Sequence, residues 1–456
     1  MEFEILNPWW KGREYIKEDK HIKDYESMKL QWRHPLLDEL DLNFNNIFSL
    51  RGPRQIGKTT FVKLLIRKLL DNGVSERAIF YWNCDNITGK NELADMIRKY
   101  IELSETFRVN ERYIFLDEIS GVENWQKAIK FLVDSGELEN VCLFLTGSHT
   151  LDIQYGTDWL PGRCGKEGRD FLMLPLTFRE FAQLVNPELM KEIPKIDSIS
   201  VTEIKEKSGK AVAFGVELKT LFNQYLITGG FPLTINEFFV NQKVPEYVYD
   251  LYARWIIGDI VKWKKSEKIL MQLMRAVLLK QGSQVSWDSL AKEAEIKSHK
   301  TISLYAENLE NMFVLSVLYY IDLNKKIPDY SKNKKIYFFD PFIYHIFNRL
   351  CYFKETEITP SLIEAVVINN LSMRSGAGIN KIRKNIFYWK NKKEIDCVLN
   401  IEGELLACEI KYQKNITAAD WVPLYKFKTG VLATKDYFEL KENYAAIPVH
   451  VLLGIL

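Results

Sequence analysis

Residues 49–60 decide the fold, and they read Ser-Leu-Arg-Gly-Pro-Arg-Gln-Ile-Gly-Lys-Thr-Thr. The glycines, lysine and first threonine of this stretch fill the pattern G-x-x-x-x-G-K-[ST] of a phosphate-binding loop. In such a loop the glycines let backbone N–H groups curl around the β-phosphate, Lys58 reaches the β- and γ-phosphate oxygens, and the Thr59 hydroxyl coordinates Mg²⁺. We therefore predict that the chain binds ATP or GTP, with contacts from the whole loop: Gly52, Pro53, Arg54, Gln55, Ile56, Gly57, Lys58, Thr59 and Thr60.

The sequence around the loop supports this prediction. Residues 48–50 end a short apolar strand, and residues 60–70 continue as an amphipathic helix whose N-terminus faces the phosphates. Further along, the apolar run of residues 112–116 ends in Asp117 and Glu118. A buried strand of this kind would place Asp117 in the Mg²⁺ shell and let Glu118 orient and deprotonate the attacking water. A core strand that merely ends in acids is the alternative.

A third apolar strand, over residues 141–146, ends in Gly-Ser-His. We expect the polar residue at its tip, Ser148 or alternatively Thr146, to sense the γ-phosphate. Together with a strand near residues 78–82, the alternation of strands and helices across residues 47–148 indicates a parallel α/β sheet. Such a sheet binds its ligand at the carboxyl ends of the strands.

Two later residues are weaker candidates for nucleotide contacts. Arg163 follows Leu-Pro-Gly and could neutralise charge on a γ-phosphate, in its own chain or from a neighbouring subunit of a homo-oligomer. An ordinary surface arginine fits equally well. Pro232 ends the glycine-rich turn LITGGFP, residues 226–232, which would suit a lid that contacts the nucleotide or would simply end a helix.

Composition narrows the class of protein. The chain has 456 residues, of which 47% are hydrophobic and 27% charged, and this is typical of an ordered protein with about two to four domains. The net charge of +2 requires any nucleic-acid surface to be local. The six cysteines include no C-x-x-C pair, which argues against a zinc site or a disulfide framework and for a reducing compartment. Because no apolar run reaches about 18 residues and no signal peptide begins the chain, we expect a cytoplasmic protein without a membrane partner.

A set of short motifs resembles those of a known family. They are NPWW at 7–10, GPRQIGKTT at 52–60, FLDEI at 115–119, LTGSH at 145–149, GR at 162–163 followed by LPLTFREF at 174–181, and GGFP at 229–232. This set is similar to that of the archaeal and bacterial AAA-type ATPases of the STAND-related group. Those proteins typically carry a C-terminal restriction-endonuclease-like domain.

The resemblance implies an α/β fold class: an ASCE-type P-loop parallel sheet, a helical lid, a winged helix-turn-helix and a small α/β endonuclease-like domain. We accordingly expect an N-terminal extension and ATPase core over residues 1–183, a linker and lid over 184–262, a winged helix over 263–345 and the endonuclease-like domain over 346–456. Residues 186–215 depart from the family pattern, since they read as a longer polar linker.

The middle of the chain has the pattern of a winged helix. A helix over residues 269–279 precedes one capped by Ser286, and Ser-His-Lys-Thr at residues 298–301 opens a candidate recognition helix. Strands over 313–321 and 335–339 would flank a lysine-rich loop. These features suit contact with DNA through phosphates and a groove, although such modules also act as protein–protein adaptors. The lysines of the loop are Lys325, Lys326, Lys332 and Lys334.

The last part of the chain carries a second chemical pattern. Glu364 lies in a predicted helix, Asp396 on a strand, and Glu409 and Lys411 on the next strand as E-x-K. In a hairpin, Asp396 and Glu409 would lie side by side and Lys411 would share their face, because side chains alternate along a strand. The two carboxylates could hold one or two Mg²⁺ or Mn²⁺ ions, with Glu364 completing the shell and Lys411 activating water. This arrangement resembles the PD-(D/E)xK nuclease core; the alternative is an inactive ion-pair cluster.

Two hypotheses about function follow from these patterns. In the first, ATP hydrolysis in the N-terminal domain drives or licenses metal-dependent DNA cleavage by the C-terminal acids. In the second, the ATPase is a slow nucleotide switch, and the winged helix and nuclease-like domain only bind DNA or a protein partner. The complete set of acids and lysine favours the first, whereas the near-neutral net charge counts against it. The basic stretch with aromatic residues at 381–393 suits either nucleic acid or a core strand.

Overall fold

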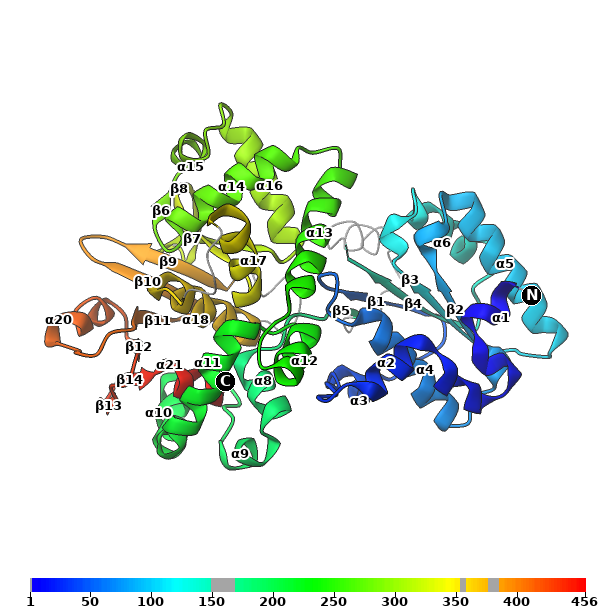
Figure 1. The fold of residues 1–456 in the computed structure, drawn as a ribbon, viewed down its shortest axis with the longest axis horizontal. Helices are drawn as coiled ribbons and strands as arrows, with labels where there is room; N and C mark the ends of the chain where they lie inside the picture. Colours follow the sequence, from blue (N-terminus) through cyan, green and yellow to red (C-terminus); the bar gives the residue numbers. More distant parts are fainter. Residues whose placement is uncertain (1, 149–168, 353–357, 376–384) are drawn as a thin grey trace. The chain divides into compact units, whose positions relative to one another are not determined.

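The chain divides into two compact units, Met1–Leu174 and Pro175–Leu456, and each is described by itself (Figure 1). The computed structural model describes residues 2–148, 169–352, 358–375 and 385–456. Within these ranges, no helix is long and apolar enough to cross a membrane.

The first unit is built on a five-stranded sheet in which every pairing is parallel. The strand order is β2-β3-β4-β1-β5, so β4 lies between the strand that leads into the phosphate loop and the strand that ends in Asp117. The predicted parallel α/β sheet is therefore confirmed, and the short β5 is an addition that the sequence did not indicate. The strands are β1 Asn46–Arg51, β2 Ile79–Asn83, β3 Arg112–Asp117, β4 Val141–Gly147 and β5 Asp170–Leu172.

Helices connect these strands in the alternation that a parallel sheet requires. The helix after the phosphate loop, α4 (Lys58–Asp71), begins directly at the loop lysine and buries one face that includes Phe61 and Leu65. The other helices of the unit are α1 Glu2–Leu6, α2 Lys20–Ser27, α3 Leu36–Glu39, α5 Lys90–Thr106 and α6 Trp125–Asp134.

The segment around NPWW covers the edge strand β2. The Asn7 amide donates to the carbonyl of Tyr81 at 3.0 Å and accepts the Tyr81 N–H at 2.7 Å, as a neighbouring strand would. Both indole N–H groups, of Trp9 and Trp10, donate to the carbonyl of Ile79. The N-terminal extension thus satisfies backbone groups that an open sheet edge would leave unpaired.

The second unit begins with helices, and these include the stretch that was expected to be a linker. Residues 186–215 form α9 and α10, and α10 buries Ile204 and packs against the C-terminal helix α21 (Val449–Ile455). The apolar residues Val201, Ile204 and Ala211 repeat at helical spacing, a signal that the polar residues between them obscured. The helices here are α8 Phe178–Val185, α9 Pro187–Glu192, α10 Val201–Ala211, α11 Gly215–Thr228, α12 Pro232–Asn241 and α13 Glu246–Lys262.

The GGFP turn between α11 and α12 is tightly packed. Gly229 has φ 61°, and a Cβ there would lie 1.9 Å from the Asp340 carboxylate. A Cβ on Gly230 would lie 2.2 Å from the carbonyl oxygen of Leu176. The Gly230 N–H donates to Asp340 at 2.8 Å. These contacts explain both glycines by packing and hydrogen bonding within the second unit.

The elements expected of the winged helix occur in the predicted order. Ser286 caps α15 and Ser298 caps α16. The strand predicted over residues 335–339 begins earlier, because β8 continues through the lysine-rich segment. The elements are α14 Glu267–Lys280, β6 Gln284–Val285, α15 Trp287–Glu293, α16 His299–Asn311, β7 Leu315–Asp322 and β8 Ile327–Phe338.

These strands join those of the endonuclease-like region in one nine-stranded sheet of order β13-β14-β12-β11-β10-β9-β7-β8-β6. The junction is narrow, since β7 and β9 pair at Tyr320 and Tyr388. The boundary proposed between residues 345 and 346 lies inside α17, and the one between 183 and 184 lies inside α8. The remaining elements are α17 Pro341–Tyr352, α18 Pro360–Ser375, β9 Ile386–Lys390, β10 Glu394–Ile401, β11 Glu404–Lys411, α20 Ala418–Trp421, β12 Thr429–Thr434, β13 Glu439–Leu440 and β14 Tyr444–Pro448.

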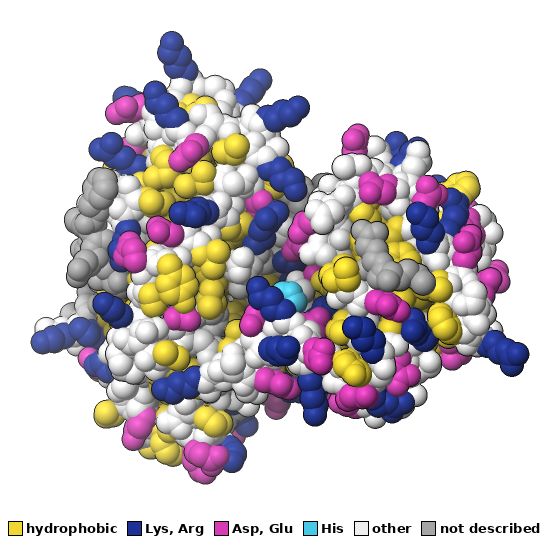
Figure 2. Space-filling model, turned by 45° about the vertical axis from the view of Figure 1, so that its right-hand side comes forward, with side chains coloured by type: hydrophobic (Ala, Val, Ile, Leu, Met, Phe, Trp, Pro, Cys, Tyr) yellow, Lys and Arg dark blue, Asp and Glu magenta, His cyan; other side chains and the backbone are white. Residues whose placement is uncertain are grey.

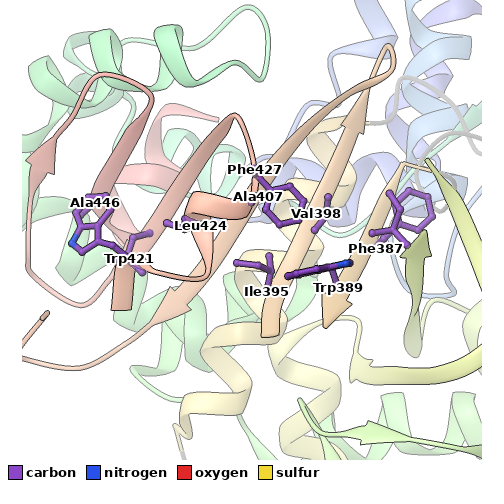
Figure 3. Packing of buried hydrophobic residues seen from close by; sticks show 11 residues of the cluster. Phe387, Trp389, Ile395, Val398, Ala407, Trp421, Leu424, Phe427 and Ala446 are labelled. Atoms are coloured by element: carbon purple, nitrogen blue, oxygen red, sulfur yellow. The ribbon is translucent and has the colours of Figure 1, made fainter. Parts of the chain in front are cut away.

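Aromatic residues of β9 belong to the core of the second unit (Figure 3). Phe387 and Trp389 pack with Val398, Trp421 and Phe427 in a buried cluster on this sheet. Of the basic stretch at 381–393, residues 381–384 lie outside the described residues. Its aromatic part is thus core strand and is not available to stack on nucleic-acid bases.

Candidate functional site

The phosphate loop connects β1 to α4 through residues whose backbone requires glycine or tolerates a left-handed conformation. Gly57 has φ 100° and Gln55 has φ 62°. Gly52 lies so close to the chain after β5 that a Cβ would stand 2.1 Å from the carbonyl oxygen of Met173. Two glycines of the motif are therefore required by geometry, which leaves the loop backbone free to approach a phosphate closely.

Lys58, the loop lysine, is buried with 4% exposure. Its ammonium group donates to the carbonyls of Gly52 at 3.1 Å and Pro53 at 3.0 Å. The same group lies 3.4 Å from a carboxylate oxygen of Glu118. One positive charge is thereby held between the phosphate loop and the carboxylate at the end of β3.

Asp117 is fully buried at the carboxyl end of β3 and accepts hydrogen bonds on both oxygens. Its Oδ2 accepts from the Thr59 hydroxyl at 2.7 Å and from the Tyr81 hydroxyl at 2.9 Å. Its Oδ1 accepts from the hydroxyl of Thr146 on β4. These donors fix the carboxylate beside the threonine of the phosphate loop.

Glu118 has an unusual backbone conformation for a non-glycine residue, with φ 53° and ψ 39°. Its N–H donates to the Thr146 hydroxyl at 3.0 Å, and its carboxylate accepts from the N–H and hydroxyl of Ser148 at 3.2 and 3.0 Å. Burial alone would raise the pKa of Glu118, but Lys58 and Arg54 outweigh it, so this pKa lies below the usual range. A strained, ionised carboxylate fixed by neighbouring strands has the features of a functional residue.

These residues suit a nucleotide with Mg²⁺. Thr59 and Asp117 supply hard oxygen ligands that already converge within 2.7 Å, and Mg²⁺ prefers such ligands. Lys58 and the loop N–H groups would bind phosphate oxygens. When bound, the metal would neutralise charge on the phosphates.

The second candidate site lies on the nine-stranded sheet, where β10 pairs with β11. The Asp396 N–H donates to the Glu409 carboxylate at 3.4 Å, and Asp396 in turn accepts the N–H of Ile410 at 3.0 Å. Lys411 lies 2.6 Å from Glu409. The pairing of β10 with β9 shifts register between Ile395 and Val398, and such bulges often redirect a side chain next to a site.

The structure adds a residue to this cluster that the sequence did not indicate, Lys335 of β8. Its ammonium lies 3.0 Å from Glu364, 2.9 Å from Asp396 and 2.5 Å from Glu394. The Lys335 side chain is 1% exposed. Two of the predicted acids, Glu364 and Asp396, come together around this lysine with Glu394, which was not predicted. Glu409 contacts Lys411 instead.

The charges in this cluster shift one another's ionisation. Burial raises the pKa of Glu364, Asp396 raises it further, and Lys335 opposes both. Burial, followed by Asp396, raises the pKa of Glu409 to about 8 against the effect of Lys411. Burial would lower the pKa of Lys335, but the surrounding carboxylates outweigh it, so its pKa lies above its ordinary value.

A divalent metal does not fit this arrangement. Within the described parts of the chain, no group of three or more histidine, cysteine, aspartate or glutamate side chains is arranged to hold a metal ion. The position toward which Glu364 and Asp396 converge is taken by the Lys335 ammonium. The predicted Mg²⁺ or Mn²⁺ ligands Asp396 and Glu409 instead bond to protein donors.

Three segments of the chain match known families. Residues 44–182 match a family model described as an AAA domain. Residues 44–182 are thus similar to AAA domains, and this part of the chain is called the AAA domain below. Residues 219–351 and 361–451 match two further families, each described as a domain of unknown function.

Individual relatives are distant. An uncharacterized protein of Methanocaldococcus jannaschii, MJ1544, is 25% identical over 387 residues, which are 83% of this chain and 77% of the relative. Among solved structures, the Aeropyrum pernix ORC2 protein is 11% identical with a TM-score of 0.37, over 68% of this chain and 89% of that one. The Aeropyrum pernix ORC1 protein in complex with DNA is 12% identical with a TM-score of 0.32, over 80% and 97%. Both TM-scores are low, and neither similarity bears on function.

Most of the residues predicted for the nucleotide site lie together in the AAA domain. Lys58, Thr59, Asp117, Glu118 and Ser148 form one set of contacts that is connected through the Thr146 hydroxyl. Arg163 lies outside the described residues. Pro232 begins α12 in the second unit, and its contact with the nucleotide stays a prediction.

Sequence reasoning missed Tyr81 of the AAA domain and left Thr146 as an alternative. Both are buried and both bind Asp117. For Thr146 the available signal was its position near the carboxyl end of β4, since parallel strands end at one edge, whereas Tyr81 lies in the middle of β2 and had no such signal. For Lys335 the signal was weaker: it is the last lysine before an apolar run, residues 336–339.

The lysines of the predicted wing differ in exposure. Lys325 and Lys332 are exposed, and so is Lys326, whose ammonium donates to the carbonyl of Gly403. Lys334 is buried and lies over the ring of Trp287 at 4.7 Å. The expectation that Lys334 belongs to an exposed basic loop was therefore wrong.

Proposed function

We propose that the chain is an ATP-hydrolysing nucleotide switch. The observation that carries this proposal is the connected set of Lys58, Thr59, Asp117, Glu118 and Ser148 in the AAA domain. Each part of a phosphoryl-transfer site has a residue to fill it: a phosphate lysine, two hard ligands for Mg²⁺ and a carboxylate for water.

Glu118 is the residue that we assign as general base. A carboxylate that remains ionised at neutral pH can accept a proton from the attacking water, and the lowered pKa of Glu118 keeps it in that form. Its contact with Lys58 would change when phosphate oxygens attract the ammonium. Ser148, which donates twice to Glu118, then acts as a positioning residue and links the state of the γ-phosphate to the base.

We further propose that the second unit contacts DNA through α16 and the loop between β7 and β8. His299 and Lys300 are exposed at the start of α16, and Lys325 and Lys332 are exposed on the β7–β8 hairpin. On the face drawn in Figure 2, basic side chains are interspersed with acidic ones, in keeping with a net charge of +2. The DNA surface would thus be local, and a protein-adaptor role is the alternative.

We favour the switch over coupled DNA cleavage, because the acids that cleavage would need are bound to Lys335 and Lys411. Contacts of Arg163 or Pro232 with the nucleotide, and a homo-oligomer in which Arg163 acts in trans, belong to the same proposal.

Steady-state ATP turnover by the full chain tests the first part of the proposal. Lys58→Ala should abolish turnover, whereas Glu118→Gln should retain ATP binding and lose turnover. Glu123→Gln is the matched control, because Glu123 is an exposed carboxylate on the same loop. Wild-type turnover by Lys58→Ala would remove the phosphate-loop assignment, and wild-type turnover by Glu118→Gln would remove the base.

Fluorescence anisotropy with a labelled DNA duplex tests the second part. Affinity should fall as salt rises, and the double substitution Lys300→Ala with Lys325→Ala should weaken binding and reduce the salt dependence. Lys23→Ala, an exposed lysine of the first unit, is the control. Equal binding by the double variant would favour a protein-adaptor role for this surface.

A further inference from the structure

We infer that the ammonium group of Lys335 is the resident cation of the acid cluster on the nine-stranded sheet, in the place where an endonuclease of this type would hold a divalent metal. The cluster is then a structural joint and takes neither Mg²⁺ nor Mn²⁺. This inference concerns the second unit and does not depend on ATP hydrolysis by the first.

The first argument is the completeness of the ammonium's contacts. A lysine ammonium has three N–H donors and no acceptor. Glu364, Asp396 and Glu394 each place an oxygen within 2.5–3.0 Å of Nζ, which is the range of charge-assisted hydrogen bonds. One acceptor is therefore available for every donor of this buried cation.

The second argument is that Asp396 and Glu364 also accept hydrogen bonds from donors other than Lys335. The Asp396 oxygen that does not face Lys335 accepts the N–H of Ile410 at 3.0 Å. The Glu364 oxygen bonded to Lys335 also accepts from the Tyr337 hydroxyl at 2.6 Å. A metal ion would have to displace these donors as well as the ammonium.

The third argument is that Lys335 is fixed by its backbone. In the sheet it pairs with Gln284 of β6 on one side and with Leu318 of β7 on the other. Gln284 also donates to Glu394 at 2.5 Å. The backbone of Lys335 is therefore held in a ladder of three strands, beside the carboxylates that its side chain contacts.

The acid cluster lies where two groups of strands of the nine-stranded sheet meet. The β6–β8 strands meet the β9–β14 strands at the narrow pairing of Tyr320 with Tyr388. Lys335 crosses from β8 to Asp396 and Glu394 on β10, and to Glu364 on α18. A single buried cation thus ties the predicted winged-helix part to the endonuclease-like part.

Manganese binding to the full chain, measured in the absence of nucleotide, tests this inference. The electron paramagnetic resonance signal of free Mn²⁺ reports how much of the ion is bound. The wild type should show no site that is lost on Asp396→Asn. Lys335→Met should create one site that binds Mn²⁺ at least tenfold more tightly than the wild type, and the added Asp396→Asn substitution should remove it. Lys334→Met is the matched control, because Lys334 itself lies over the Trp287 ring, so its replacement should leave Mn²⁺ binding unchanged.

Two results would overturn the inference. One is a wild-type Mn²⁺ site that disappears on Asp396→Asn, and this comparison remains decisive even if Lys335→Met does not fold. The other is a folded Lys335→Met variant, shown by its circular dichroism spectrum, that binds Mn²⁺ no better than the wild type. Neither result would alter the turnover expected of Lys58→Ala, so failure here is distinguishable from failure of the ATPase proposal.

Discussion

Each unit contains a buried lysine that faces carboxylates, and the two lysines differ in what surrounds them. Lys58 of the AAA domain bonds to two backbone carbonyls and one carboxylate, that of Glu118, whose side chain is 20% exposed. Lys335 is surrounded by three carboxylates at 2.5–3.0 Å. Two carbonyls and one carboxylate are contacts that a phosphate can replace, whereas three charge pairs around one buried ammonium are not.

The comparison shows that catalytic residue types alone do not identify a metal site. The charged groups that contact the carboxylates must also be known. In the AAA domain, Asp117 is held by hydroxyl donors, so its negative charge is left for a metal. In the second unit, Asp396 faces an ammonium. The residues of the first site therefore suit Mg²⁺, whereas we expect the acid cluster of the second unit not to bind it.

Replacing each lysine by methionine should have opposite effects, and this is the largest expected difference. Lys58→Met should abolish ATP turnover with a small loss of stability. Lys335→Met should keep turnover but lower the free energy of unfolding by about 3–5 kcal/mol, because it removes the one cation that three clustered carboxylates share, including the buried Asp396. Urea unfolding and steady-state turnover of both variants provide the measurement.

Lys335→Arg is the control for this pair of variants, since it keeps the charge with a different shape. If the urea concentration at the midpoint of unfolding were the same for Lys335→Met and the wild type, the Lys335 ammonium would not be a structural cation. If it lost turnover while remaining folded, the two sites would not be independent.

Glu118→Gln should lower ATP turnover by about 10²–10⁴-fold, the usual contribution of a general base. Binding of a fluorescent ATP analogue should remain, because the phosphate loop is unchanged. Asp396→Asn, which removes a carboxylate from the second site, should leave turnover at the wild-type rate. Equal turnover by Glu118→Gln and the wild type would contradict the role of Glu118.

Ser148→Ala should reduce turnover by a smaller factor and change its pH dependence. The Ser148 hydroxyl helps to lower the pKa of Glu118, so its removal raises that pKa. Because the base must be deprotonated, the acidic limb of the rate profile should move to higher pH, and turnover should recover as pH rises. A uniform loss at all pH values would indicate contact with phosphate in place of an effect on Glu118.

Glu409→Gln should remove a pH dependence of stability in the second unit. The pKa of Glu409 is raised from 4.5 to about 8 in the folded state. Its stabilising contribution is therefore present below pH 4.5 and lost as pH rises through about 8. Relative to Glu409→Gln, the wild type should lose stability over this window, measured by urea unfolding; parallel curves for the two proteins would contradict the raised pKa.

Local patterns predicted most of the AAA domain, and contacts distant in sequence explain what they missed. The loop from Gly52 to Thr59 is contiguous, and its strand and helix follow directly, so its chemistry is readable from one segment. Lys335 lies 61 residues before Asp396 and in a different predicted domain, so no local spacing connects the two. The helices of 186–215 were missed because polar residues outnumber the apolar ones that repeat at helical spacing.

Manganese stoichiometry of the full chain, measured with and without a non-hydrolysable ATP analogue, tests the central claim most directly. We predict one bound Mn²⁺ per chain that requires the analogue and is lost on Thr59→Ala, because Thr59 and Asp117 would supply its protein ligands. We predict no analogue-independent Mn²⁺ that responds to Asp396→Asn. A second bound ion that needs no analogue and disappears on Asp396→Asn would contradict the account.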